Sequence, residues 1–420
     1  MQHDQIYFLI TCIAMVLFMT PGLAFFYGGL VRASSVVSMM MMSFGALALV
    51  SILWIAYGYA MAFSGAGAAG YIGIDGVLGI DLNNLFLNEF LHERMSFDLV
   101  FAAFQGTFAV ITVALISGAI ADRARFGSWM VFAGLWASLV YFPIAGWVFN
   151  FTLDDEGVII DGGWLVKDVG LLDFAGGTVV EVGSGAAALA VALVLGKRFG
   201  FRKGMYAPHN VPLTLIGAGI LWFGWFAFNA GSELAADGIA SLAFLNTLIA
   251  PAAAMLSWAA FERITAGKPT AVGIASGAVA GAVAITPSCA FLDPVWAIVL
   301  GLVVGVVCAW AIELKFALGF DDSLDVVGIH LVGGVIGTLF IGVFGRGVGL
   351  FFGHGADQLI AQALGVLTVG LYSFVMAWLI AYGIEKTIGF RVQSVDEEAG
   401  IDPIQHGQLA YHVDDPRWKR

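Results

Sequence analysis

Charged side chains are scarce in this sequence. Of its 420 residues, 11% are Asp, Glu, Lys or Arg and 60% are hydrophobic, whereas a soluble globular domain has about 25% charged residues. This composition argues against an ordinary soluble domain. It predicts a polytopic membrane protein of the all-α class instead, and we expect no nucleic-acid partner.

Cysteine is also rare, and the sequence lacks the usual arrangements of catalytic side chains. Cys12, Cys289 and Cys308 have neither the spacing of a disulfide framework nor that of metal ligands. We interpret them as small apolar fillers. Because we find no Ser/His/Asp arrangement and no cluster of metal ligands, we predict that the chain is not an enzyme and holds no metal or cofactor.

Long apolar runs are what the sequence does contain. The N-terminal run lacks a basic segment before it and continues too far for a signal peptide, so we expect it to be the first span. Hydropathy predicts eleven transmembrane helices, at roughly 6–31, 37–63, 98–121, 127–149, 173–195, 211–231, 239–261, 270–288, 294–316, 326–345 and 359–385.

The distribution of basic residues predicts the orientation of these spans. With the N-terminus outside, the expected cytoplasmic loops hold Arg32, Arg123, Arg125, Lys197, Arg198, Arg202, Lys203, Arg263, Lys268 and Lys315. Only Arg94, Lys167 and Arg346 then lie outside, as the positive-inside rule requires. The C-terminus is therefore predicted to be cytoplasmic. The outer loops carry acidic residues, Glu156 among them, which either attract a cation or form a solvated acidic face.

Two spans share a pattern around an ionisable residue. In the fifth, Asp173 precedes Glu181 by eight residues and Gly185 follows it by four; in the tenth, Asp322, His330 and Gly334 repeat these spacings. Ionisable groups deep in a membrane span are candidates for function. Because helices five spans apart run in opposite directions, we predict an inverted repeat of helices 1–5 and 6–10, with Glu181 and His330 meeting near the midplane.

Several separated strings resemble the ammonium transporter family of Amt, MEP and Rh proteins. They are PGLAFFYGGLVR, FQGTFAVITVALISGAIADR, LDFAGGTVVEV, GWFAFNAGS, AITPSCA, DDSLDVVGIH and, in the tail, GIDPIQHGQLAY. The resemblance implies an eleven-helix subunit of a homotrimer in the cell (inner or plasma) membrane. Each subunit would have its own pore and move ammonium or ammonia inward. It also implies a PII-type regulatory protein as a partner at the cytoplasmic face.

The family's functional positions can be carried over to this sequence. Those matching its substrate-recruitment site are Phe108, Phe149 and Ser232, with Trp225 nearby, and those matching its aromatic gate are Phe108 and Phe228. Glu181 and His330 match the pore pair, Asp173 an acidic position that supports the site, and Thr286 a pore-lining position. Without the resemblance, ordinary packing would explain the aromatics, and helix capping would explain Asp173.

Two positions depart from the usual bacterial pattern of the family. Glu181 stands in place of the first of two pore histidines, as in some fungal members, and Phe149 stands where a Trp is expected. Phe attracts a cation less strongly than Trp, and Trp147 or Trp164 are alternatives for that role. We expect the carboxyl and imidazole groups to titrate as a coupled pair that assists passage of the substrate or its proton.

Three functions compete at this stage. The leading hypothesis is an ammonium transporter; the alternatives are an ammonium sensor of the same fold and an Rh-like electroneutral channel for ammonia or carbon dioxide. We expect residues 1–385 to form the membrane domain and residues 386–420 a cytoplasmic tail. That tail either binds the PII-type protein or is a disordered terminus.

Overall fold

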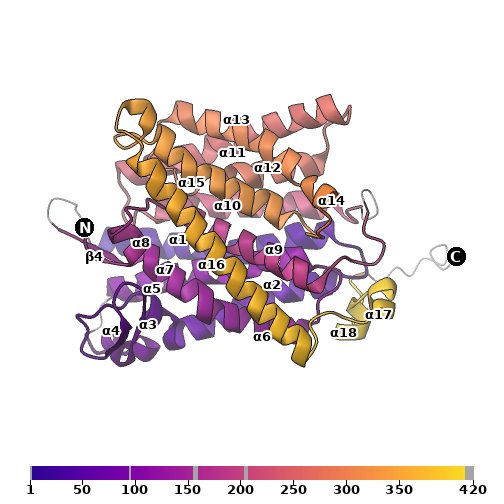
Figure 1. Cartoon of the computed structure of the whole chain (residues 1–420), viewed down its shortest axis with the longest axis horizontal. Helices are drawn as coiled ribbons and strands as arrows, with labels where there is room; N and C mark the ends of the chain where they lie inside the picture. Colours follow the sequence, from indigo (N-terminus) through magenta and orange to yellow (C-terminus); the bar gives the residue numbers. More distant parts are fainter. Residues whose placement is uncertain (1, 94–95, 155–158, 203–206, 412–420) are drawn as a thin grey trace.

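The computed structural model describes residues 2–93, 96–154, 159–202 and 207–411. Long helices dominate it, and most of them run roughly along the longest axis of the molecule, while the last long helix crosses them obliquely (Figure 1). Three of the charged loop residues named above lie outside the described residues, namely Arg94, Glu156 and Lys203. Residues 412–420 of the tail also lie outside them.

Ten helical stretches in the described residues are long and apolar enough to cross a membrane. Four are single helices, α1 (Gln2–Leu30), α10 (Val211–Gly231), α11 (Gly238–Thr265) and α16 (Asp357–Thr387), and a fifth stretch combines α13 (Pro294–Ala311) with the short α14 (Leu314–Leu318). The others combine α2 (Val36–Leu53), η1 (Trp54–Gly58) and α3 (Tyr59–Ala62); α5 (Ser96–Ile116) and η3 (Ser117–Ile120); α6 (Phe126–Trp136), η4 (Ala137–Tyr141) and α7 (Phe142–Phe149); η5 (Gly177–Val182) and α9 (Gly183–Leu195); and η6 (Val327–Leu331) and α15 (Val332–Phe344).

The predicted eighth span is the shorter helix α12 (Ala271–Ile285). Its 15 residues rise about 22 Å, less than the roughly 30 Å of hydrocarbon in a bilayer. It ends at Thr286, where Pro287 follows and cannot continue the hydrogen-bond ladder. The all-α polytopic class is therefore confirmed, while a count of eleven complete crossings stays a prediction.

Short elements lie between and beyond the long helices. Two antiparallel hairpins pair β1 (Tyr71–Ile74) with β2 (Leu78–Asp81) and β3 (Phe151–Leu153) with β4 (Ile159–Gly162). The short helices are η2 (Leu82–Leu87), α4 (Asn88–Glu93), α8 (Trp164–Lys167), α14 (Leu314–Leu318), η7 (Leu350–Phe352), α17 (Ser394–Ala399) and α18 (Asp402–His406).

The two predicted halves meet through corresponding helices. On α1 and α10, the first spans of the halves, a Cβ added at Gly217 would lie 2.2 Å from the backbone nitrogen of Phe26, so glycine permits the close approach. The fifth spans also touch, since a Cβ at Gly334 would lie 2.8 Å from the Cβ of Glu181. Contacts between equivalent helices are what an inverted repeat predicts for elements near its axis.

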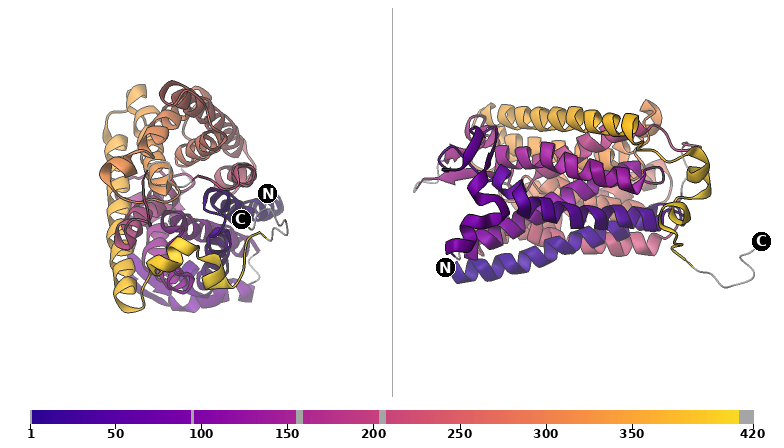
Figure 2. Two further views of the ribbon diagram at one scale, coloured as in Figure 1. Left: turned by 90° about the vertical axis from the view of Figure 1, so that its right-hand side faces the viewer. Right: turned by 90° about the horizontal axis from the view of Figure 1, so that it is seen from below.

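The C-terminal tail packs against one end of the bundle, opposite the end that holds the N-terminus (Figures 1 and 2). The Asp402 carboxylate accepts hydrogen bonds from the backbone N–H groups of Val37 and Ser38 at 2.9 and 2.8 Å. Arg32 donates to the backbone oxygen of Glu397 at 2.6 Å. The described part of the tail is therefore docked, and the basic loop residue Arg32 lies on its side of the molecule.

Candidate functional site

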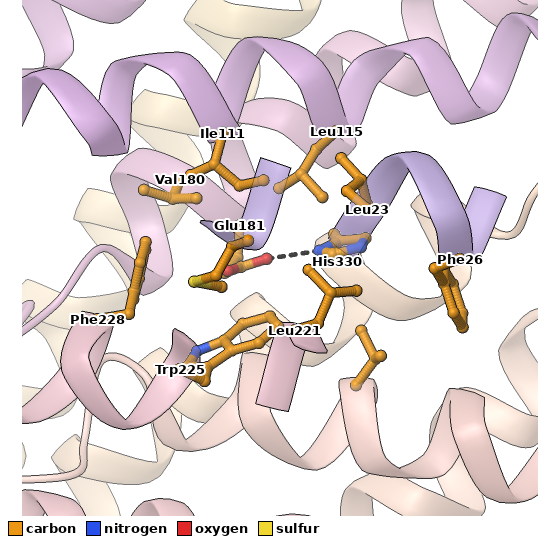
Figure 3. Close-up of a pocket in the computed structure, with 12 residues that line it drawn as sticks. Leu23, Phe26, Ile111, Leu115, Val180, Glu181, Leu221, Trp225, Phe228 and His330 are labelled. Atoms are coloured by element: carbon orange, nitrogen blue, oxygen red, sulfur yellow. Dashed lines mark hydrogen bonds and ion pairs between the residues drawn. The ribbon is translucent and has the colours of Figure 1, made fainter. Parts of the chain in front are cut away.

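Glu181 and His330 meet inside the bundle. Nδ1 of His330 lies 2.6 Å from Oε2 of Glu181, and both side chains are almost completely buried. Figure 3 shows the two side chains reaching toward each other from separate helices. The contact expected from the repeated sequence pattern is thus present, and at this distance one proton lies between the two groups.

Both residues lie in short π-helical segments, Glu181 in η5 and His330 in η6. Such segments insert an extra residue into a helical turn and are frequent at functional sites. The carboxylate of Asp173 accepts from the backbone N–H groups of Gly176, Gly177 and Thr178 at 2.6–2.9 Å. Asp322 caps η6 in the same way, accepting from Val327 at 2.7 Å.

The glycine of each repeat brings the two segments together. A Cβ at Gly185 would lie 2.4 Å from the backbone nitrogen of Leu331, beside His330. A Cβ at Gly334 would lie 2.9 Å from the carbonyl oxygen of Gly177 and close to Glu181. Since real side chains do not approach this closely, glycine at these two positions is what lets the pair reach hydrogen-bond distance.

The pair lines a narrow central pocket whose other walls are apolar or aromatic (Figure 3). The residues that line the central pocket are Met19, Leu23, Phe26, Ile111, Leu115, Val180, Glu181, Leu221, Trp225, Phe228, Val279 and His330. A bare cation in such surroundings loses its hydration and gains little in return, so its transfer is costly. Among the described residues that line the pocket, only Glu181 and His330 have ionisable side chains.

Phe228 and Phe108 stack at the edge of the central pocket. Their ring centroids lie 4.0 Å apart with 22° between the planes, and both rings are buried. Trp225 lines the pocket on the same helix as Phe228, and its indole N–H donates to the Thr286 hydroxyl at 2.8 Å. The structure therefore joins the predicted gate, Trp225 and Thr286 into one connected group.

The remaining predicted recruitment residues lie at helix ends. Ser232 follows the last residue of α10, and its hydroxyl donates to the carbonyl of Phe228 at 2.8 Å. Phe149 ends α7, and its ring lies 3.6 Å from where a Cβ on Gly176 would be. Asp173 caps the adjoining segment η5, which places Phe149 beside the capped end of that segment.

Trp147 and Trp164, the alternatives to Phe149, are committed to other contacts. Their rings pack edge to face at 5.8 Å, and Trp147 also lies 4.9 Å from Tyr372 on α16. The Trp147 indole N–H donates to the carbonyl of Val77 in the first hairpin. These contacts join the hairpin loop to the bundle, and the assignment of Phe149 to the cation site stays a prediction.

Sequence reasoning missed most of the apolar pocket wall. Phe26 belongs to the string AFFYGG that carried part of the resemblance, so a signal for it existed. Leu23 and Leu115 also lie within strings that carried the resemblance, whereas Leu221 lies outside them. None of the three was predicted to line a pocket, because a leucine in an apolar helix gives the same sequence pattern whether it faces lipid or a pocket. Among the described residues, no group of three or more His, Cys, Asp or Glu side chains could hold a metal ion.

A buried ionic cluster holds the tail end of the bundle. Arg198 donates through Nε and Nη2 to the two carboxylate oxygens of Asp321, at 2.9 Å each, and through Nη1 to Asp122 at 3.1 Å. Burial alone would raise the pKa of Asp321, but the hydrogen bonds from Arg198 and the charge of Arg123 outweigh it and hold the pKa below its usual range. Asp321 is thus ionised at neutral pH.

Comparison with known proteins adds an independent finding. The model of the Ammonium Transporter Family matches residues 7–411. An ammonium transporter of Mycobacterium tuberculosis is 48% identical over 95% of this chain and 88% of its own length.

Solved structures agree. One described as a sensor Amt protein superimposes with a TM-score of 0.88 at 28% identity, covering 96% of this chain and 98% of its own. Mep2 of Saccharomyces cerevisiae gives a TM-score of 0.83 at 33% identity, covering 98% and 92%. The chain is a multi-pass membrane protein that belongs to the ammonium transporter family.

Proposed function

We propose that this protein moves ammonium or ammonia inward across the cell membrane through a pore that runs through the central pocket of each subunit. The observation that carries the proposal is the Glu181–His330 pair, buried where η5 and η6 meet in an otherwise apolar pocket. Family membership and the transporters among its relatives support the choice of substrate.

Recruitment takes place at the outer end of the pocket. Phe108, Phe149 and Ser232 offer ring faces and a hydroxyl that replace part of the hydration shell of ammonium, with each cation–π contact contributing about 0.5–2 kcal/mol. Trp225 adds a further ring just inside the gate. The stacked pair of Phe108 and Phe228 then separates this site from the apolar interior.

Beyond the gate the substrate crosses as ammonia. NH₄⁺ dissociates into NH₃ and H⁺, the Glu181–His330 pair passes the proton along, and the two recombine on the other side. Glu181 takes the place of the first pore histidine of the usual family pattern, so a carboxyl and an imidazole pass the proton here instead of two imidazoles. Asp173 supports the site by fixing η5, and Thr286 lines the pore.

A sensor function is a second candidate, favoured by the similarity to a solved sensor Amt protein. The transporter function is preferred because the curated relatives that match nearly the whole chain are ammonium transporters. An electroneutral Rh-like channel is a third mode of the same pore. We further propose residues 1–385 as the membrane domain of a homotrimer and residues 386–420 as a cytoplasmic tail to which a PII-type protein binds.

Ammonium-evoked current in proteoliposomes tests the proposal. An electrogenic transporter gives a current that saturates with ammonium concentration and is accompanied by uptake. Uptake without current would favour the electroneutral channel, and neither uptake nor current, despite ammonium binding, would favour the sensor. Empty liposomes correct for passive ammonia diffusion.

A further inference from the structure

The helix α16 lies along the outside of the bundle (Figure 2). It carries a stripe of exposed apolar residues. Leu367 and Leu371 each expose 67% of their surface. The helix has 31 residues and is therefore about 46 Å long, and it runs obliquely across the other helices (Figure 1), so it is long enough to cross the roughly 30 Å of hydrocarbon even when tilted. Its exposed face thus passes through the hydrocarbon and ends among the headgroups.

The stripe ends in two aromatic rings and a cation. Trp378, Tyr382 and Lys386 follow one another at four-residue steps, which places them on one face of the helix. The rings of Trp378 and Tyr382 are parallel within 8° with centroids 4.9 Å apart. The Lys386 ammonium lies 5.4 Å from the Tyr382 ring centroid. Exposed Trp and Tyr are typical of the membrane–water interface, so Lys386 lies at the level of the headgroups.

A second cation stands beside this end of the helix. Arg125 donates through Nη1 to the carbonyl of Ile388 at 3.4 Å, and a Cβ added at Gly389 would lie 3.1 Å from the same Nη1 atom. The acidic neighbour Glu385 is engaged elsewhere, since its carboxylate accepts from the backbone N–H groups of Phe390 and Arg391. Two cations therefore stand at the end of an aromatic and apolar stripe.

We propose that this end of α16 binds an anionic phospholipid. Lys386 and Arg125 bind the headgroup phosphate, and an acyl chain lies along Trp378 and the leucines beyond it. The charge arrangement selects this occupant, because a phosphate joined to an apolar chain matches cations at the end of an apolar stripe. The bound lipid also stabilises the docked tail, since the backbone N–H of Arg125 donates to the carbonyl of Phe390. The proposal does not depend on the transport function.

Quenching of Trp378 fluorescence by brominated lipids tests this site directly. Full-length protein is reconstituted with either dibrominated phosphatidylglycerol or dibrominated phosphatidylcholine of the same chain length, and the contribution of Trp378 is the difference between wild type and Trp378→Phe. We expect the anionic lipid to be preferred at this site. Lys386→Gln should lower the preference about fivefold, and the double variant with Arg125→Gln should lower it further.

The matched control is Lys268→Gln, which removes an exposed lysine from the loop between α11 and α12 and should leave the preference unchanged. Equal quenching by both lipids, or a preference that survives the double variant, would overturn the proposal. Loss of the preference in millimolar inorganic phosphate would also overturn it and indicate a site for free anions. Absence of quenching by either lipid would show that α16 is covered by another copy of the chain.

Discussion

Phe149 differs from the tryptophan expected at the outer cation site in both the strength of its ring quadrupole and the lack of an N–H group. Replacing it by Trp should therefore strengthen recruitment. We expect Phe149→Trp to lower the apparent KM for ammonium about two- to fivefold, which corresponds to about 0.5–1 kcal/mol of added cation–π energy. Concentration-dependent uptake in proteoliposomes measures it.

The exposed residue Phe151 offers a matched control for this change. Phe151→Trp adds the same ring in the nearby hairpin, away from the gate, and should leave the apparent KM at the wild-type value. An unchanged KM in Phe149→Trp would mean that another group recruits the ion.

Asp173 acts through the backbone of η5 rather than through direct contact with the central pocket. Its carboxylate accepts from several N–H groups at once, and hydrogen bonds to a charged group contribute about 1.5–3 kcal/mol each. Asp173→Ala should therefore lower the thermal unfolding temperature of the purified protein and reduce transport. Asp357→Ala, at the exposed start of α16, is the control and should change neither. Wild-type stability in Asp173→Ala would contradict the capping role.

At the scale of elements, the contact between η5 and η6 depends on the absence of side chains at two glycines. Gly334→Ala would place a Cβ 2.8 Å from the Cβ of Glu181, so the segments must separate. We expect the free energy of unfolding to fall by about 1–3 kcal/mol, as at other overpacked positions, and transport to be lost. Unfolding temperature and uptake report the two effects.

Gly219→Ala on α10 is the matched substitution, since among the described residues a Cβ there would meet no atom within 4 Å. It should be neutral or slightly stabilising, because alanine favours helix more than glycine does. If both variants behaved alike, the close approach of the segments would not matter for function.

The meeting of Glu181 with His330 was predictable because each residue carried its own Asp and Gly at fixed spacing, and two such patterns five spans apart imply symmetry. The spans were predictable for a similar reason, since hydropathy reports membrane crossing directly. The π-helical turns around both residues were not predictable. They depend on how neighbouring helices pack, which no local pattern encodes.

Trp147 illustrates a second limit at the level of single elements. It lies two residues before Phe149 in the sequence, and spacing alone left both as candidates for the outer site. Their difference became visible only when the ring of Trp147 was found against Trp164 and its N–H on Val77. The hairpin containing Val77 was itself not predicted, because its short strands are surrounded by glycines and acidic residues.

At the scale of the whole molecule, the buried cluster around Asp321 ties the tail end of the bundle together. Because its pKa is lowered in the folded protein, the stability that Asp321 contributes is present above the ordinary Asp pKa of about 3.9 and is lost as pH falls through the lower folded value. Asp321→Asn leaves Arg198 and Arg123 without that negative charge and should lower the free energy of unfolding by about 3–5 kcal/mol at pH 7.

Thermal unfolding of detergent-solubilised wild type and Asp321→Asn over a pH series measures this contribution. The difference in unfolding temperature between wild type and Asp321→Asn should be constant from pH 7 down to about 5 and should shrink below about 4. A difference that stayed constant into the acid range would mean that the charge of Asp321 does not stabilise the fold.

The central claim is that the Glu181–His330 pair passes the proton that accompanies ammonia, and current through Glu181→Gln tests it most directly. The amide keeps the shape of the side chain but cannot ionise, so the ammonium-evoked current should fall at least about tenfold, as expected when a group that transfers protons is removed. Glu181→His should retain much of the current, and Glu398→Gln, which changes an exposed carboxylate in the tail, should retain all of it. A full and unchanged current in Glu181→Gln would contradict the account.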